Sequence, residues 1–371
     1  MPVYWGDLHG HSNLSDGRSP AKDYYEYGRD EAKLDFCALT DHVDNVPSSH
    51  LGLMPDRNWD KIRDLAKQFH EPQKFVTFLA VERAVPSWDG QSPGSMSVYY
   101  RTDDGPSLKP KHPARDWLRR GAINPDAEMS QIWRTLKDFG HLTAVHHSGS
   151  ARQGYTWTKA PAKYHFDLVE IYSKWGSSEA PAAPFPIWDG VGRGARPGGT
   201  VVDALTAGFR PGFIAGSDTH FGMPGSNVWE NDWGNAARYE RSGLTAVTAA
   251  DLTREAIFDA LKKRRCYATT GERIQLTFEI NDHPMGSIVA EPTHLRVRVQ
   301  AVGTQTIKRA EVFKNGEIAH HRTCGREELD MYFDEPVPTE PAWYYVRVTQ
   351  VAENTAWSSP IWVLPNPHPS S

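Results

Sequence analysis

The chain has 371 residues, of which 39% are hydrophobic and 23% charged, and it carries a formal net charge of -5. This length suits a barrel of about 250 residues followed by a smaller module. The weak negative charge argues against a nucleic-acid partner, which would require a basic surface, but not against a small anionic substrate, because a bound metal can supply local positive charge.

Cysteine usage and the N-terminus indicate a reducing compartment. The three cysteines, Cys37, Cys266 and Cys324, fit neither a disulfide framework nor a CxxC zinc site. The N-terminus MPVYWGDLHGHS has no basic segment followed by an apolar run, and the chain has no stretch of 18 apolar residues. We therefore expect a cytoplasmic protein without a membrane span; a leader already removed would leave no trace here.

Seven short apolar runs, rich in β-branched and aromatic residues and bounded by polar turns, predict buried parallel strands. They lie at residues 3–5, 36–39, 75–81, 142–145, 168–172, 213–215 and 244–247. Helical patterns occupy residues 20–33, 56–69, 126–139 and 251–265. This alternation of strands and helices predicts an α/β fold, and its length favours a barrel over an open sheet.

The sequence pattern changes after Gly271. Segments 274–280, 294–302, 310–313 and 343–351 alternate apolar and polar residues, and Asn315-Gly316 is a strong hairpin signal. We therefore divide the chain into a barrel over residues 1–271 and an antiparallel β-sandwich of immunoglobulin or fibronectin-like type over residues 272–371. Because no Gly/Ser-rich linker separates them, we expect the sandwich to pack against the barrel and to supply no metal ligand.

Metal-binding residue types recur at the C-terminal ends of the predicted strands, where barrel active sites are built. The clusters are His9-Gly10-His11 with Asp16 following, Asp41-His42, Glu82, His146-His147 and Asp218-Thr219-His220. Imidazole and carboxylate groups are usual ligands of Zn, Mn and Fe. A single cluster of this kind is equally compatible with a metal site and with a hydrogen-bonded pair on the surface. Five such clusters, each at the end of a predicted strand, predict a metal centre. One catalytic zinc needs about three protein ligands, so the surplus predicts two or three divalent ions.

This ordered set of motifs resembles the polymerase and histidinol phosphatase (PHP) superfamily. The motifs are DLHGHSNLSDG, ALTDH, a strand ending in Glu82, HHSG and GSDTH. The segments EIYS, GFIAGSDTH and RRCYATTG are most similar to its DUF3604 branch. The resemblance covers roughly residues 4–271. It implies a distorted (β/α)7 barrel and a di- or trinuclear Mn, Zn or Fe centre.

The resemblance also implies a ligand set. By position, the metal ligands are His9, His11, Asp16, His42, Glu82, His147, Asp218 and His220. Asp16 matches a position that binds metal in only some members, and Glu82 matches the bridging carboxylate. We expect Glu82, Asp218 and His147 to take part in catalysis. Since adjacent strand residues face opposite ways, the same alignment leaves His146 as a substrate contact.

One departure from the superfamily pattern concerns the segment after the glutamate. Many members carry a further histidine there, whereas residues 93–98 read PGSMSV. One metal would then be weakly held, replaced, or bound by His146 instead. Asp7 and Asp41 are expected to orient ligands or simply to form hydrogen bonds at strand ends.

Cations near predicted strand ends are candidates for binding an anionic substrate. Lys174 directly follows the strand at residues 168–172 and is the first choice, with Arg210 as a second and Arg152 and Arg196 in long loops. Each one singly is also compatible with a solvated surface charge. Glu170 and Tyr172 share a strand face and are candidates to line the pocket, although ordinary packing is the simpler interpretation of both.

Hydrolysis of a phosphoester by metal-activated water is the leading prediction, because phosphoryl oxygens can span two ions. No nucleophile elbow, P-loop or Rossmann glycine run is present. One alternative is a different reaction at the same site, such as amide, ester or lactone hydrolysis or a lyase reaction. Another is a non-enzymatic role in which the sandwich binds a partner or glycan, although the surplus of ligands argues against it. The substrate, the metal and the oligomeric state are left open.

Overall fold

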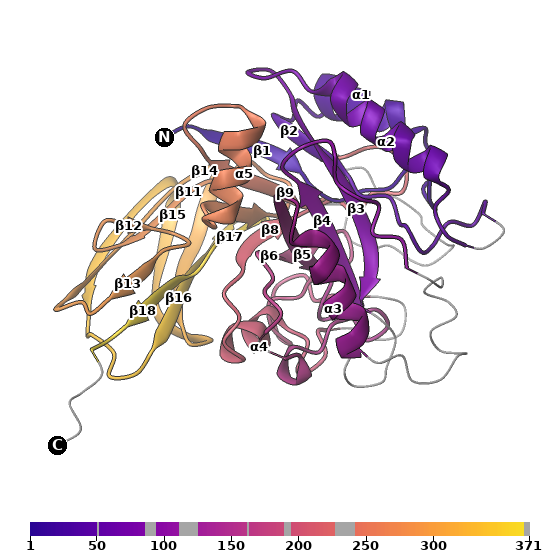
Figure 1. Ribbon diagram of the computed structural model, residues 1–371. Helices are drawn as coiled ribbons and strands as arrows, with labels where there is room; N and C mark the ends of the chain where they lie inside the picture. The colour runs from indigo at the N-terminus through magenta and orange to yellow at the C-terminus, as the bar shows by residue number, and fades with distance from the viewer. Residues whose placement is uncertain are drawn as a thin grey trace.

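The computed structural model describes residues 1–49, 52–85, 94–110, 125–161, 163–188, 194–226 and 242–366. Pro93 and the last five residues of the predicted second domain lie outside these described residues. Figure 1 shows a mixed α/β arrangement in which the N-terminal strands and helices lie on one side and the C-terminal strands on the other. Within the described ranges, no helix is long and apolar enough to cross a membrane.

Each of the seven predicted strands of the N-terminal part is present. The strands of this part are β1 (Val3–Asp7), β2 (Phe36–Leu39), β3 (Val76–Val85), β4 (Gly94–Tyr100), β5 (His141–His146), β6 (Leu168–Ser173), β7 (Gly176–Ser177), β8 (Gly212–Ala215), β9 (Leu244–Thr248) and β10 (Cys266–Thr269). The helices are α1 (Ala21–Asp30), α2 (Asp56–Phe69), α3 (Pro125–Leu136), the 3-10 turn η2 (Trp157–Lys159), α4 (Val201–Thr206) and α5 (Arg254–Lys262). The four predicted helices correspond to α1, α2, α3 and α5, with ends shifted by a few residues.

The strands form a closed system of mixed direction. β1, β2 and β3 are parallel to one another, as are β5, β6 and β8. β4 lies antiparallel between β3 and β5, and β9 lies antiparallel between β1 and β10. The expectation of parallel strands is therefore wrong at β9, and the antiparallel strand β4 was not predicted. The sequence of β4, GSMSVYY, mixes small polar and apolar residues, so it lacks the continuous apolar run typical of a buried strand.

The interior of this ring of strands is apolar at one end and polar at the other. Inward-facing side chains form one buried cluster that includes Phe36, Ala38, Val76, Phe78, Ala80, Leu142, Ala144 and Leu168, and residues of α5 belong to it. Helix α5 lies at the N-terminal ends of the strands, where Arg254 Nε donates to the carbonyl of Thr77. The same side-chain alternation continues to the C-terminal ends of β3, β5 and β6, where the inward positions are Glu82, His146 and Glu170.

The C-terminal part is built from β-strands, of which β14 and β15 are the longest. They are β11 (Gln275–Ile280), β12 (His283–Pro284), β13 (Ile288–Ala290), β14 (Leu295–Lys314), β15 (Glu317–Glu335), β16 (Ala342–Gln350), β17 (Thr355–Ser358) and β18 (Ile361–Leu364). β14 and β15 form a hairpin, and its turn residues Asn315 and Gly316 have φ of 51° and 89°. This confirms the predicted hairpin, because a tight turn of this type requires positive φ at both positions.

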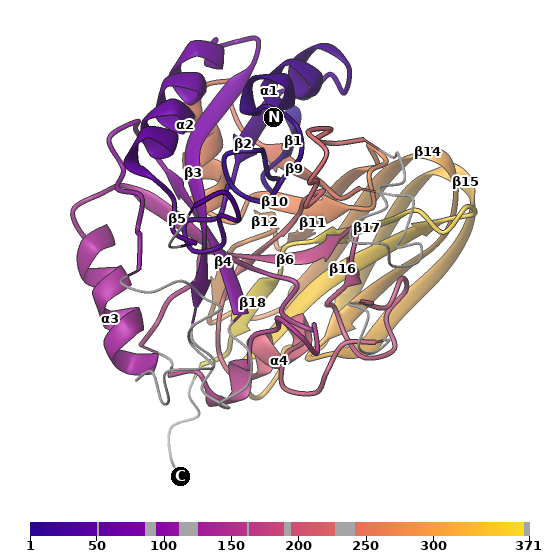
Figure 2. The ribbon, with the colours of Figure 1, turned by 90° about the vertical axis from the view of Figure 1, so that its right-hand side faces the viewer.

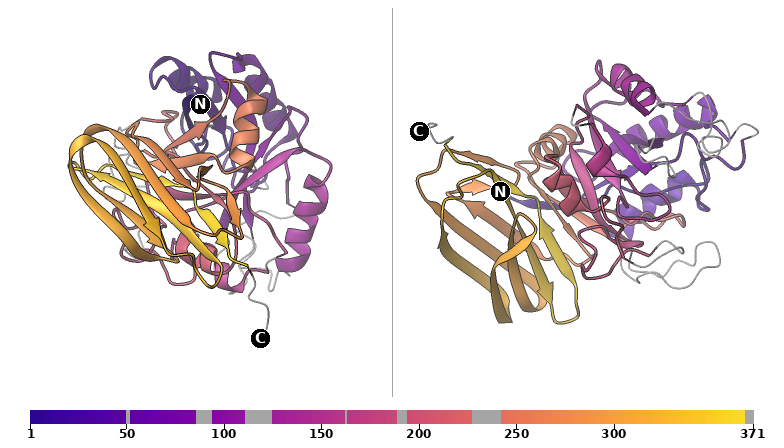
Figure 3. Two further views of the ribbon diagram at one scale, coloured as in Figure 1. Left: turned by 90° about the vertical axis from the view of Figure 1, so that its left-hand side faces the viewer. Right: turned by 90° about the horizontal axis from the view of Figure 1, so that it is seen from below.

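A bend in β14 lets the C-terminal strands form two layers, which Figures 2 and 3 show beside the N-terminal part. The pairing register shifts between Val302 and Ile307. Before this bulge β14 pairs with β11, and after it β14 pairs with β16. Most of these pairings are antiparallel, as predicted, but β13 and β18 pair in parallel.

The two parts of the chain share hydrogen bonds and a buried carboxylate. β10 pairs with β17 across the predicted boundary at residue 271. Glu179, which is 1% exposed, accepts hydrogen bonds from Tyr345 Oη at 2.8 Å, Arg347 at 2.9 Å and Trp357 Nε1 at 2.9 Å. These contacts fit the expectation of a packed interface.

We expect Glu179→Ala to lower the free energy of unfolding by about 3 kcal/mol, because it removes one partner of a buried ion pair and leaves buried donors without an acceptor. Urea unfolding of the full chain measures this change. Glu317→Ala is the matched control, since Glu317 is exposed at the start of β15. If the two variants had equal free energies of unfolding, Glu179 would not stabilise the contact between the two parts of the chain.

Candidate metal centre

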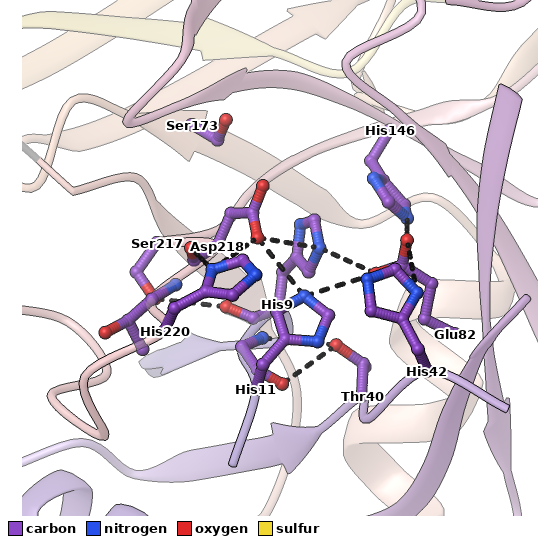
Figure 4. Close-up of polar contacts among 12 residues, drawn as sticks. His9, His11, Thr40, His42, Glu82, His146, Ser173, Ser217, Asp218 and His220 are labelled. Atoms are coloured by element: carbon purple, nitrogen blue, oxygen red, sulfur yellow. Dashed lines mark hydrogen bonds and ion pairs between the residues drawn. The ribbon is translucent and has the colours of Figure 1, made fainter. Parts of the chain in front are cut away.

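Backbone contacts bring the first and last sequence motifs together at the polar end of the barrel (Figure 4). The His11 N–H donates to the carbonyl of Thr219 at 2.8 Å, and the Asp218 N–H donates to the carbonyl of His9 at 2.9 Å. His42 forms an isolated β-bridge with Glu82. Residues far apart in the sequence are thereby fixed within reach of one another.

Glu82 lies between two pairs of histidines. Its Oε2 atom is 3.2 Å from His9 Nε2 and 3.3 Å from His11 Nε2. Its Oε1 atom is 3.4 Å from His42 Nδ1 and 3.5 Å from His146 Nε2. Glu82 is 1% exposed, so both oxygens of this buried carboxylate face histidines rather than solvent.

Asp218 occupies the other side of the same cluster. Its Oδ1 atom is 3.2 Å from His11 Nε2, 3.5 Å from His9 Nε2 and 3.7 Å from His220 Nδ1. Its other oxygen accepts a hydrogen bond from Trp175 Nε1. Asp218 has a φ of 53°, a conformation rare for a residue with a side chain, and such backbone strain concentrates at functional sites.

Asp16 forms an outer group with three histidines. Its oxygens are 3.6 Å from His220 Nε2, 3.7 Å from His42 Nε2 and 3.8 Å from His11 Nδ1. The loop that carries Asp16 is held by Asp41, which accepts hydrogen bonds from its serine residues. The expectation that Asp41 orients this region is consistent with these contacts.

Four sets of side chains have ligand atoms within 4.8 Å of one another. They are His11, Asp16, His42 and His220; His9, His11 and Asp218; Glu82, His146 and His147; and His9, His146 and Glu170. All eight residues of the expected ligand set occur in these groups, together with two more, His146 and Glu170. In the described part of the chain, none of the four groups contains a residue beyond His220, and metal binding by them stays a prediction.

The adjacent histidines do not obey the expected alternation. β5 ends at His146, and His147 has a φ of 34°, so the extended backbone that would turn its ring away is interrupted. Both rings lie against Glu82, with exposed fractions of 2% and 7%. The prediction that only one of the two faces the centre is therefore wrong. His146 lies among the ligand candidates, which favours the expected alternative in which it binds metal over its expected role as a substrate contact.

The segment after Glu82 that lacks the additional histidine expected from the superfamily pattern forms strand β4. Ser97 pairs with Glu82, and Ser95 pairs with His146. Small side chains at these two positions leave room for the rings of His146 and His147. This arrangement favours one of the expected alternatives, in which His146 supplies the ligand that β4 lacks.

Glu170 belongs to the site although its sequence position suggested ordinary packing. Its Oε2 atom is 2.7 Å from His9 Nδ1, and 2% of the residue is exposed. The alternation of side chains along β6 could have placed Glu170 toward the interior, because it shares a strand face with Leu168, which belongs to the interior cluster. The apolar neighbours on this strand masked that signal.

The cationic side chains that were predicted to bind an anionic substrate do not lie together in one place. Lys174 follows β6 directly and is buried, and Arg152 lines a cavity of about 20 Å³ with His147 and Trp175. Arg210 is wrong as a substrate contact, because it precedes β8 and so lies at the opposite end of that strand from Asp218. Arg196, in a long loop, donates to Thr156 Oγ1 at 3.0 Å.

Electrostatic coupling within the centre is strong. Burial opposes charge on Glu82 and Asp218, yet the neighbouring histidines hold the pKa of both carboxyls well below the usual range. Burial likewise opposes charge on His11, but Asp218 and Glu82 outweigh it and raise the His11 pKa to about 10. Burial raises the pKa of Glu170 to about 7 and lowers the pKa of His146 well below its usual value.

The donor set fits divalent transition ions. Several buried atoms of the cluster have no hydrogen-bond partner within the described residues: His11 Nδ1, His42 Nδ1, His146 Nδ1 and Nε2, His147 Nδ1 and Glu170 Oε1. Unsatisfied buried polar atoms are unfavourable, and cations would satisfy them. Mixed imidazole and carboxylate donors suit Zn, Mn or Fe.

Comparison with known proteins links the chain to others of similar sequence. Residues 227–281 match the family model DUF3604, described as a protein of unknown function. The chain is 28% identical to an uncharacterized protein of Chlamydia pneumoniae, covering 97% of this chain and 57% of that protein. An uncharacterized protein of Chlamydia trachomatis gives the same identity and coverage. This chain therefore spans a little over half the length of these relatives.

A solved structure shares the overall fold. It is a two-domain protein of Bacteroides vulgatus described as containing a predicted PHP-like metal-dependent phosphoesterase. The match has a TM-score of 0.50 at 16% identity and covers 94% of this chain and 91% of that chain. At this level of identity the match shows a shared fold.

We expect His146→Ala and His147→Ala each to weaken metal binding, by roughly 10-fold or more, because both rings lie against Glu82. Competition against a graded series of chelators measures this for full-length protein. His141→Ala, at the start of β5 and half-buried, is the matched control. Metal affinity lost in only one of the two variants would restore the one-ligand prediction.

The metal-free protein should lose stability as the pH rises. The pKa of His11 is about 10 in the folded chain against an ordinary value of 6.5. Its charge interactions therefore stabilise the fold fully below about pH 6.5, and this contribution disappears as the pH rises through about 10. Unfolding in the presence of a chelator should show the decline, and His11→Gln should reduce it. A decline of equal size in the variant would count against His11 as its source.

Proposed function

We propose that this protein is a metal-dependent phosphoesterase whose centre binds two or three divalent ions of Mn, Zn or Fe. The observation that carries the proposal is the position of Glu82, between the His9–His11 pair and the His42–His146 pair. A single ion needs about three protein ligands, so the eight expected ligands together with His146, which lie in overlapping groups, support more than one ion.

Divalent ions bound here would polarise phosphoryl oxygens and lower the pKa of a bound water. The chain contributes the geometry. Glu82 and Asp218 would fix the spacing of the ions, because each carboxylate lies within reach of more than one histidine. Neutral histidines such as His146, whose pKa burial lowers, have a lone pair available for a metal at neutral pH.

We propose that substrate approaches the centre on the side of His147, next to a small cavity of about 20 Å³. Arg152 and Gln153 line it together with Trp175, whose indole N–H donates to Asp218. A cationic side chain at this edge would bind an anionic group of the substrate. Lys174, next to Trp175 in the chain, stays a proposed contact of the same kind. We accordingly propose a small anionic molecule as substrate, with no nucleic-acid partner.

The Bacteroides vulgatus protein supports this choice of chemistry. It is described as containing a predicted PHP-like metal-dependent phosphoesterase, and it shares the fold of this chain. A common fold does not fix the substrate, so the phosphoester assignment depends on the ligand cluster.

A second candidate is hydrolysis of an amide, ester or lactone at the same centre. The position of Arg210, at the far end of β8 from Asp218, favours it, because fewer cations than expected surround the ligand cluster. A substrate without a phosphoryl group would need fewer positive side chains.

The test combines metal analysis with a substrate panel. Protein purified without chelator should contain more than one equivalent of transition metal and hydrolyse phosphomonoesters or phosphodiesters faster than carboxylic esters, amides and lactones. Glu82→Gln and Asp218→Asn should reduce turnover at least 100-fold with little change in fold, because each removes a charge that offsets the ions.

Less than half an equivalent of metal, not restored by adding Mn or Zn, would overturn the metal centre. Preferential turnover of carboxylic esters, amides or lactones would replace the phosphoesterase assignment with the second candidate. Glu317→Gln, on the exposed start of β15, controls for the removal of a carboxylate.

A further inference from the structure

His9 is held from both ring nitrogens by different carboxylates. Its Nδ1 atom is 2.7 Å from Glu170 Oε2, whereas its Nε2 atom is 3.2 Å from Glu82 Oε2 and 3.5 Å from Asp218 Oδ1. The Nδ1 contact is the shortest of the three. His9 therefore has one side facing β6 and the other facing the ligand cluster.

The backbone at Gly216 lies close to both side chains of this contact. A Cβ atom at Gly216 would lie 2.5 Å from His9 Cβ and 2.9 Å from Glu170 Oε2. Glycine directly after β8 thus allows the His9 ring and the Glu170 carboxylate to approach each other. Both side chains are at most 2% exposed, so water does not compete for the hydrogen bond.

A neutral imidazole carries its proton on one nitrogen and its lone pair on the other. A carboxylate next to Nδ1 accepts a hydrogen bond from an N–H at that position, so the proton stays on Nδ1 and the lone pair is left on Nε2, which faces Glu82 and Asp218. Histidine ligands in proteins generally have such a partner, which fixes both the tautomer and the orientation of the ring.

We propose that Glu170 is a positioning residue that accepts the Nδ1–H of His9 and so directs His9 Nε2 toward the metal centre. This inference rests on the metal centre of the proposed function. Glu170 lies outside the ligand set implied by the motifs, and in this role it contacts a ligand and not the ion itself.

The test compares Glu170→Ala with Glu170→Gln in the full chain. A glutamine oxygen can still accept the Nδ1–H but is a poor metal ligand. Glu170→Ala should therefore weaken binding of one zinc equivalent by roughly 10- to 100-fold, the usual effect of losing such a partner. Glu170→Gln should stay within a few-fold of the unmodified protein. Glu311→Ala, at a buried carboxylate that pairs with Arg347 in the C-terminal part, controls for loss of a buried charge.

Nuclear magnetic resonance of ¹⁵N-histidine in the zinc-loaded protein gives a second readout. In the unmodified protein and in Glu170→Gln, the His9 signals should show a proton on Nδ1, and in Glu170→Ala this signature should be lost or mixed. A general loss of stability, as in Glu311→Ala, would not change the tautomer.

Three results would overturn the inference. Unchanged zinc affinity in Glu170→Ala would show that His9 needs no partner. Equal loss of one zinc equivalent in both Glu170 variants would make Glu170 a direct ligand. An unchanged His9 tautomer in Glu170→Ala would show that other contacts fix the ring. All three leave metal binding and turnover by the unmodified protein intact, whereas failure of the unmodified protein to bind metal would overturn the proposed function itself.

Discussion

The need to offset buried negative charge governs the N-terminal part of this protein. Asp16, Glu82, Glu170 and Asp218 converge at one end of a ring of strands, and each lies near at least one imidazole. The buried charge of Glu179 is offset without imidazoles, because a guanidinium, a phenol and an indole all donate hydrogen bonds to this carboxylate. The contrast matters because imidazole can be either a donor or a ligand, and a cluster of neutral imidazoles and carboxylates suits cations.

The rest of the barrel holds these groups in place. Helix α5 and the interior apolar cluster fill the opposite end, so the strands are fixed relative to one another. Asp7 accepts hydrogen bonds from the N–H groups of His9, Ser217 and Gly225, and thereby ties the loop after β1 to the loop after β8. The C-terminal strands extend this framework through the pairing of β10 with β17. The ligand groups found in the described residues all lie before residue 221, so none of them includes a residue of these strands.

Local sequence patterns predicted most elements. Apolar runs located β1, β2, β3, β5, β6, β8 and β9, and Asn315-Gly316 located the turn of the β14–β15 hairpin. The direction of β9 and the existence of β4 escaped prediction for a physical reason. An apolar run shows that a strand is buried but does not show in which direction it runs, so the direction of β9 could not be predicted. β4 has serines at the positions that pair with Glu82 and His146, and these serines interrupt the apolar run by which the other strands were recognised.

The sequence by itself determined which residue types are available to the site and their order along the chain, because metal-binding side chains at strand ends are visible as local motifs. Only the tertiary structure decided which of them meet. The positive φ of His147 turns both adjacent histidines toward Glu82, which strand alternation alone excludes. Glu170 meets His9 because β6 pairs with β8, and the segment after β8 is hydrogen-bonded to the loop after β1. The two residues are 161 positions apart in the sequence. Arg210 is excluded because it precedes its strand. Motifs encode chemistry locally, whereas the distances between them depend on how the strands close into a ring.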